Sequence, residues 1–182
     1  MNFPALAQTW ANFYLLTGEA AATLSGLMFV AVTFGASLAS QGALSSARSF
    51  IDPILSHFVQ VLLVSCLFIV PTLTPTALGY CLVGMAAFRS ARLITIFKHV
   101  RQAHRQAGDV DVSDWLINLG VPASAYLGLF AIGTGFILER PAAFNGLAIY
   151  CGLMLTLGIV GAWELLLWMV TRVHADRGEP SK

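Results

Sequence analysis

Long apolar stretches separated by short polar segments run through most of this chain. A helix that crosses a bilayer needs about 20 mostly apolar residues, because each residue adds about 1.5 Å along the helix axis. We expect five such helices, at residues 14–40, 54–70, 76–98, 114–138 and 142–173. The pattern therefore predicts an all-α fold, in which a polytopic bundle of five transmembrane helices forms a single domain.

Proline residues mark the expected boundaries of the second and third helices. Asp52 and Pro53 suit the N-cap and the first position of the second helix. Pro71 and Pro75 bracket a three-residue turn. These signals predict a tight antiparallel hairpin between the second and third helices.

The two ends of the chain differ from the apolar stretches. Residues 1–13 contain Trp10 and Phe13, and we expect this segment to lie along the membrane interface as a short amphipathic lead-in. Residues 174–182 are mostly polar and predict a solvated tail.

Lysine and arginine fall almost entirely on one side of the five expected helices. Because successive loops alternate sides, nine of the ten basic residues share one side, and Arg140 is the exception. Cytoplasmic loops carry an excess of Lys and Arg, so the N-terminus is expected outside and the C-terminus in the cytoplasm. A count of four or six helices would mix the two sides, so the charge bias also supports five.

Composition agrees with a membrane protein and excludes several classes of function. The chain is 57% hydrophobic and 10% charged, with a mean hydropathy of +0.76, whereas soluble domains average roughly 25% charged residues. Nucleic-acid binding is not expected, because no basic stripe is interleaved with exposed aromatic residues. The three cysteines lie inside apolar stretches without paired ligands at short spacing, so neither a metal site nor any cofactor is expected.

One stripe of the first expected helix is polar. Its members recur at alternating spacings of four and three, which places them on one helical face. This candidate polar path comprises Glu19, Thr23, Gly26, Thr33 and Ser37, with Val30 between them. Two interpretations stay open: a helix lining a polar path at an oligomer axis, or a packing seam in which small and hydroxyl residues permit close approach.

A second group of polar residues is expected in the inner half of the membrane. Glu164 and Arg89 lie at comparable depth, Arg92 is one turn shallower, and His57 and Gln60 share a face of the second helix. Intramembrane ionisable residues favour a proton or ion path. The alternatives are an ion pair that fixes helix order, or long side chains that reach the inner surface.

Small residues four positions apart predict tight helix packing. They are Gly120, Ser124 and Gly128, then Ala131 and Gly135, and finally Gly158 and Ala162.

The segment GEAAATLSGLMFVAVTFGASL, from Gly18 to Leu38, resembles the opening helix of a family of small uncharacterised bacterial membrane proteins. Members of that family are often labelled modulators of a membrane-bound ATP-dependent protease. The later segment GAWELLLWMV is similar to the Trp-containing end of their last helix. The resemblance implies a modulating role and a multi-pass location in the bacterial cytoplasmic (inner) membrane, and it implies no catalytic residues.

The expected function is that of a non-enzymatic integral membrane accessory or regulatory subunit. Short loops and the lack of ionisable pairs at catalytic spacing argue against an enzyme. The alternative is a homo-oligomeric ion channel lined by the polar stripe of the first helix. The expected partners are the lipid bilayer and either further copies of the chain or another membrane protein.

Overall fold

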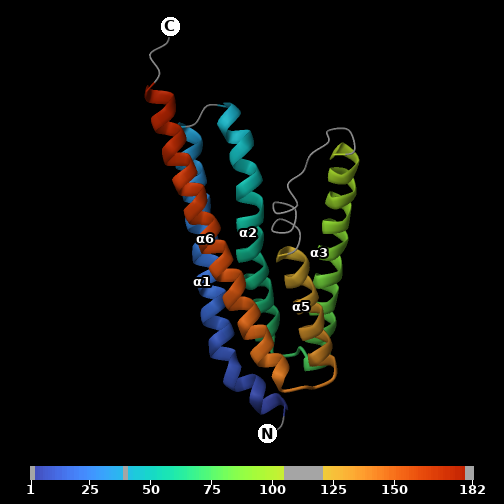
Figure 1. Cartoon of the computed structure of the whole chain (residues 1–182). Coiled ribbons are helices and arrows are strands. Elements are labelled where there is room, and N and C mark those ends of the chain that lie inside the picture. Colours follow the sequence, from blue (N-terminus) through green and yellow to red (C-terminus); the bar gives the residue numbers. More distant parts are fainter. Residues whose placement is uncertain (1–2, 39–40, 105–120, 179–182) are drawn as a thin grey trace. The chain divides into compact units, whose positions relative to one another are not determined.

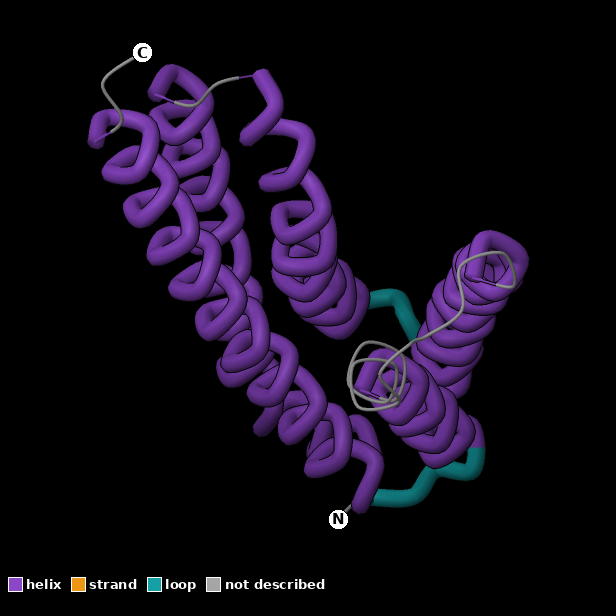
Figure 2. The backbone as a smooth tube through the Cα atoms, turned by 45° about the horizontal axis from the view of Figure 1, so that its top comes forward, coloured by secondary structure: helices purple, strands orange, loops and turns teal. Residues whose placement is uncertain are grey.

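The computed structural model describes residues 3–38, 41–104 and 121–178 of the chain. This described part holds five helices and no strand, which confirms the all-α prediction (Figures 1 and 2). The helices are α1 (Phe3–Leu38), α2 (Gln41–Ile69), α3 (Pro75–His104), α5 (Val121–Ile137) and α6 (Ala142–Gly178).

Three of these helices are long and apolar enough to cross a membrane. By length and composition, the candidate spans are Ala5–Phe34 in α1, Ile51–Ile69 in α2 and Ala142–Leu167 in α6. The apolar part of α5, Ser124–Ile137, is shorter than these. The five crossings and their orientation stay predictions.

The first helix begins earlier than expected. Residues 3–13 continue directly into α1 and do not form a separate lead-in element. Pro4 stands at the second residue of the helix, where its missing N–H is harmless. No glycine or further proline interrupts the chain between Pro4 and Tyr14, so nothing in this segment favours a break before the membrane span.

The second helix also begins earlier, at Gln41, and Pro53 lies inside it. Asp52 is therefore not the N-cap of this helix, and its expected start at residue 54 is wrong. The last helix runs through Gly178, so the first residues of the expected solvated tail are helical. The expected start of the fourth helix, at residue 114, lies outside the described residues.

Two short turns connect the helices. In the first, the Leu73 amide donates a hydrogen bond to the Val70 carbonyl at 3.2 Å, and Thr74 Oγ1 accepts one from the Ala77 amide at 3.2 Å. Thr74 therefore caps the start of α3. In the second turn, Glu139 adopts a φ of 50°, and the Arg140 amide donates to the Gly135 carbonyl at 2.9 Å. The first turn falls where Pro71 and Pro75 predict it, and the second lies between the expected fourth and fifth helices.

Packing divides the chain into two compact units. The first unit comprises residues 1–10 and 70–150 and therefore contains α3 and α5. We call it the hairpin unit, after the pair α3 and α5, which is a different pair from the predicted hairpin of the second and third helices. The three-helix unit comprises residues 11–69 and 151–182, and therefore contains α2 and most of α1 and α6. The single-domain prediction is not tested by this division.

Two glycines let α3 and α5 approach closely inside the hairpin unit. A Cβ on Gly79 would lie 2.7 Å from the Gly133 carbonyl oxygen and 2.9 Å from the Ile137 amide nitrogen. A Cβ on Gly133 would in turn lie 3.0 Å from the Gly79 carbonyl oxygen. Backbone therefore meets backbone at this crossing, as small residues permit in membrane helices. Near the second turn, the rings of Phe136 and Phe144 pack edge to face with centroids 5.0 Å apart.

The three-helix unit has a continuous apolar core. Phe58 of α2 lies against α6 at Gly158, where even one added carbon would collide with its ring. The buried members of this core come from all three helices: Met28, Ile54, Phe58 and Leu165. The core fixes which face of each helix points inward.

The glycine crossing of the hairpin unit predicts a large difference between two alanine substitutions in α3. Gly79→Ala should destabilise the protein by about 1–3 kcal/mol, the usual cost of overpacking, because backbone atoms block its Cβ. Gly84→Ala is the matched control, since no described atom lies within 4 Å of its added carbon. Alanine there should be neutral or stabilise by up to about 1 kcal/mol. Thermal unfolding in mild detergent measures both, and equal melting temperatures for the two variants would contradict the crossing.

Candidate functional site

One face of α1 is buried within the three-helix unit. Its buried residues recur three or four positions apart, as expected for one face of a helix. They include Tyr14, Thr17, Ala21, Ser25 and Met28. This face mixes aromatic, hydroxyl and apolar side chains, so hydropathy alone does not distinguish it from the rest of the helix.

The polar stripe expected to carry function is exposed instead. Glu19, Thr23, Gly26 and Thr33 all lie on the outer surface of α1. The side chain of Ser37 lies outside the described residues. No described atom comes within 4 Å of the position that a Cβ on Gly26 would take. Within the three-helix unit, the stripe is therefore not a packing seam.

The threonines of the stripe have their hydrogen bonds inside α1. Thr23 Oγ1 donates to the Glu19 carbonyl at 2.8 Å, and Thr33 Oγ1 donates to the Phe29 carbonyl at 2.8 Å. Each hydroxyl proton is thus satisfied without water or a second helix. The stripe presents one carboxylate, at Glu19, and an open stretch of backbone at Gly26.

The second group of candidate residues is divided between the two units. Glu164 is exposed on α6 in the three-helix unit, whereas Arg89 is half-buried on α3 in the hairpin unit. The side chain of Arg92 lies outside the described residues. An ion pair of Glu164 with either arginine therefore stays a prediction.

The polar neighbours of that group lie together on α2. Gln60 is almost fully buried, with 1% of its surface exposed, and His57 is half-buried one turn away. Both belong to the three-helix unit, as Glu164 does. Among the described residues, no three His, Cys, Asp or Glu side chains come together in a way that could hold a metal ion.

A buried hydroxyl pair between α1 and α2 was missed by the sequence analysis. Thr17 Oγ1 and Ser65 Oγ lie 3.3 Å apart, and Thr17 Oγ1 also donates to the Tyr14 carbonyl at 3.1 Å. Because the Thr17 hydroxyl has one proton, Ser65 is then the donor to Thr17. Beside them, a Cβ on Gly18 would lie 2.8 Å from Ser65 Cβ. The signal in the sequence was the small residue at position 18 next to a hydroxyl residue.

Aromatic packing extends this contact toward the end of α2. The Tyr14 ring is fully buried, and its centroid lies 4.0 Å from that of Phe68, with the two planes inclined by 32°. Tyr14 and Thr17 of α1 therefore meet Phe68 and Ser65 of α2 in antiparallel order. This order sets the register of the two helices.

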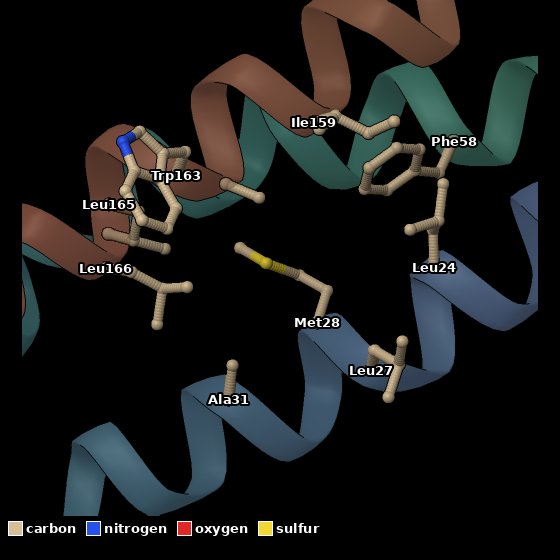
Figure 3. Close-up of a pocket in the computed structure, with 10 residues that line it drawn as sticks. Leu24, Leu27, Met28, Ala31, Phe58, Ile159, Trp163, Leu165 and Leu166 are labelled. Carbon is tan, nitrogen blue, oxygen red and sulfur yellow. The ribbon is translucent and has the colours of Figure 1, made fainter.

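A cavity of about 290 Å³ lies between the helices of the three-helix unit (Figure 3). Ten side chains from α1, α2 and α6 line it, and all are aliphatic, aromatic or methionine. Met28 extends from α1 into the space, Phe58 of α2 closes one end, and Trp163 of α6 lies toward the other end. Three of the α1 residues in the lining, Leu24, Leu27 and Ala31, form an apolar stripe of α1 between its polar stripe and its buried face, and Met28 belongs to the buried face.

No protein-family model, curated protein or solved structure matches this chain. The resemblance of the first helix to the bacterial membrane family therefore stays a prediction.

Proposed function

We propose that this protein is a non-enzymatic accessory or regulatory subunit of a membrane, and that it binds another transmembrane helix through the polar stripe of α1. The observation that supports this most is the exposure of Glu19, Thr23, Gly26 and Thr33 on a helix long enough to span. A face with a carboxylate and an open glycine is poorly suited to lipid, whereas a second helix can pack on it closely.

The buried fractions of the three candidate spans favour α1 as the binding helix. In α1, 22% of the most apolar window is buried, compared with 33% in α2 and 39% in α6. Ala22 and Gly26 are both exposed and four residues apart, which is the small-xxx-small spacing of close helix pairs. A partner helix crossing at Gly26 would lie next to Thr23 and reach Glu19 about two turns away.

The proposal includes a location and an orientation. We infer a multi-pass protein of a bacterial cytoplasmic membrane with five crossings, the N-terminus outside and the C-terminus in the cytoplasm. The support is the nine-to-one distribution of basic residues and the three spans of sufficient length. The crossings by α3 and by the segment that includes α5 rest on the charge distribution.

Helix docking at Gly26 predicts that a bulky residue there prevents assembly. Gly26→Leu should weaken association by about 1–3 kcal/mol, because extra carbons would separate two closely packed backbones. Gly152→Leu is the matched control, since this exposed glycine of α6 also has no described atom within 4 Å of its added carbon. Light scattering after gentle detergent extraction measures the mass of the protein complex. Wild type and Gly152→Leu should exceed the 19.5 kDa of one chain, and Gly26→Leu should approach it.

Two outcomes would contradict this proposal. A wild-type protein that is extracted as a single chain has no stable partner. Equal masses for the two glycine variants would show that the polar stripe is not the binding face.

A homo-oligomeric ion channel is the second candidate. It is supported by the same exposure, because a pore shared between subunits needs its polar lining on the outside of each chain. Glu19 would then form an acidic ring that concentrates cations. Glu19→Gln should lower cation flux into liposomes, most strongly at low salt, where screening is weak. No flux above empty liposomes, or a flux that Glu19→Gln leaves unchanged, would exclude the channel and leave the accessory role.

A further inference from the structure

We propose that the cavity of the three-helix unit binds one acyl chain of a membrane phospholipid, an inference that rests on the proposed membrane location. The cavity measures about 290 Å³. Apolar cavities of roughly 150 Å³ already stay free of water and take up small apolar molecules. Ligand sites range from about 300 to 1,000 Å³, so this cavity has the size of a small one.

The chemistry of the lining selects a hydrocarbon. The indole nitrogen of Trp163 is the single side-chain nitrogen or oxygen among the ten lining residues. A water molecule inside would lack the two to four polar partners that it needs. A lipid headgroup or a polar metabolite would lose its hydration without gaining hydrogen bonds. The ligand is therefore the apolar chain of a molecule whose polar end stays outside.

The position of the cavity places it next to the acyl chains of the membrane. Its α1 lining lies within the span Ala5–Phe34, and its α6 lining within Ala142–Leu167. Leu27 and Leu166, at its edge, are exposed on the outside of the unit. The cavity thus opens on a surface that hydrocarbon surrounds when these helices cross a bilayer. Phospholipid acyl chains are the most abundant hydrocarbon there.

Small residues keep the cavity open. Ala31 of α1 and Ala162 of α6 each present only a methyl group to it. Met28 and Phe58 form its inner wall, with 5% and 1% of their surfaces exposed. Lipid that merely surrounds the protein does not reach these two side chains. A chain inside the cavity touches both.

Photolabelling from an acyl chain tests the inference. The probe is a phosphatidylcholine that carries a diazirine near the middle of one acyl chain, in vesicles that contain the full-length protein. Illumination followed by peptide mass spectrometry locates the labelled residues. Phe29, adjacent to Met28 but 60% exposed, reports contact with surrounding lipid. Val61, buried outside the cavity, reports non-specific labelling.

The expected result is label on Phe29, Met28 and Phe58, with none on Val61. Ala162→Leu should fill the cavity and abolish the label on Met28 and Phe58 while that on Phe29 remains. Ala31→Leu gives the same test from α1 if the first variant does not fold. If Phe29 is labelled but Met28 and Phe58 are not, the cavity inference is overturned and the membrane location stays intact. If none of these three residues is labelled, both the membrane location and the cavity inference are overturned.

Discussion

The close contact between α1 and α2 at Gly18 and Ser65 is the constraint on which the three-helix unit depends. With no Cβ at position 18, the Ser65 side chain approaches the backbone of α1, and its hydroxyl reaches Thr17 at 3.3 Å. The contact fixes the rotation of α1, because residues two apart in a helix point about 200° apart. When Thr17 faces α2, Glu19 must face away from it.

Because of this rotation, the neighbouring stripes of α1 face different surroundings. The stripe containing Thr17, Ser25 and Met28 packs against α2 and α6. The stripe from Glu19 to Thr33 is left outside, where a second membrane helix can pack on it. The apolar stripe between them faces the cavity that is suited to an acyl chain. Protein partner and lipid are therefore proposed to meet the same helix at adjacent faces.

Hydropathy was sufficient to predict the all-α fold, and Pro71 and Pro75 lie at the first observed turn, where they were expected. The first residues of the helices were harder to predict. Pro53 resembles a first helical residue, but neighbouring residues continue α2 back to Gln41, and local sequence does not reveal that. The small-residue pattern was also insufficient: Gly128 has no described atom within 4 Å of an added Cβ, whereas the crossing of α3 and α5 uses Gly79 and Gly133.

The candidate site shows the same limit. Periodicity grouped Glu19, Thr23, Gly26 and Thr33 correctly on one face, but it could not decide whether that face points inward. Thr17 and Ser25 form an equally polar pattern on the opposite side. The choice between them depends on Ser65, which is 48 residues from Thr17 in the sequence. Pairings over such distances are set by packing between helices, so the spacing of polar and apolar residues within one helix does not reveal them.

Disulfide trapping measures the rotation of α1 most directly. In a protein whose three native cysteines are replaced, Thr17→Cys and Ser65→Cys should oxidise to an intramolecular disulfide, because their side chains are in contact and a disulfide needs Cβ atoms about 3.5–4.5 Å apart. Glu19→Cys with Ser65→Cys should stay reduced under the same conditions. A disulfide from position 19 in place of position 17 would place the polar stripe inside the unit and contradict the account.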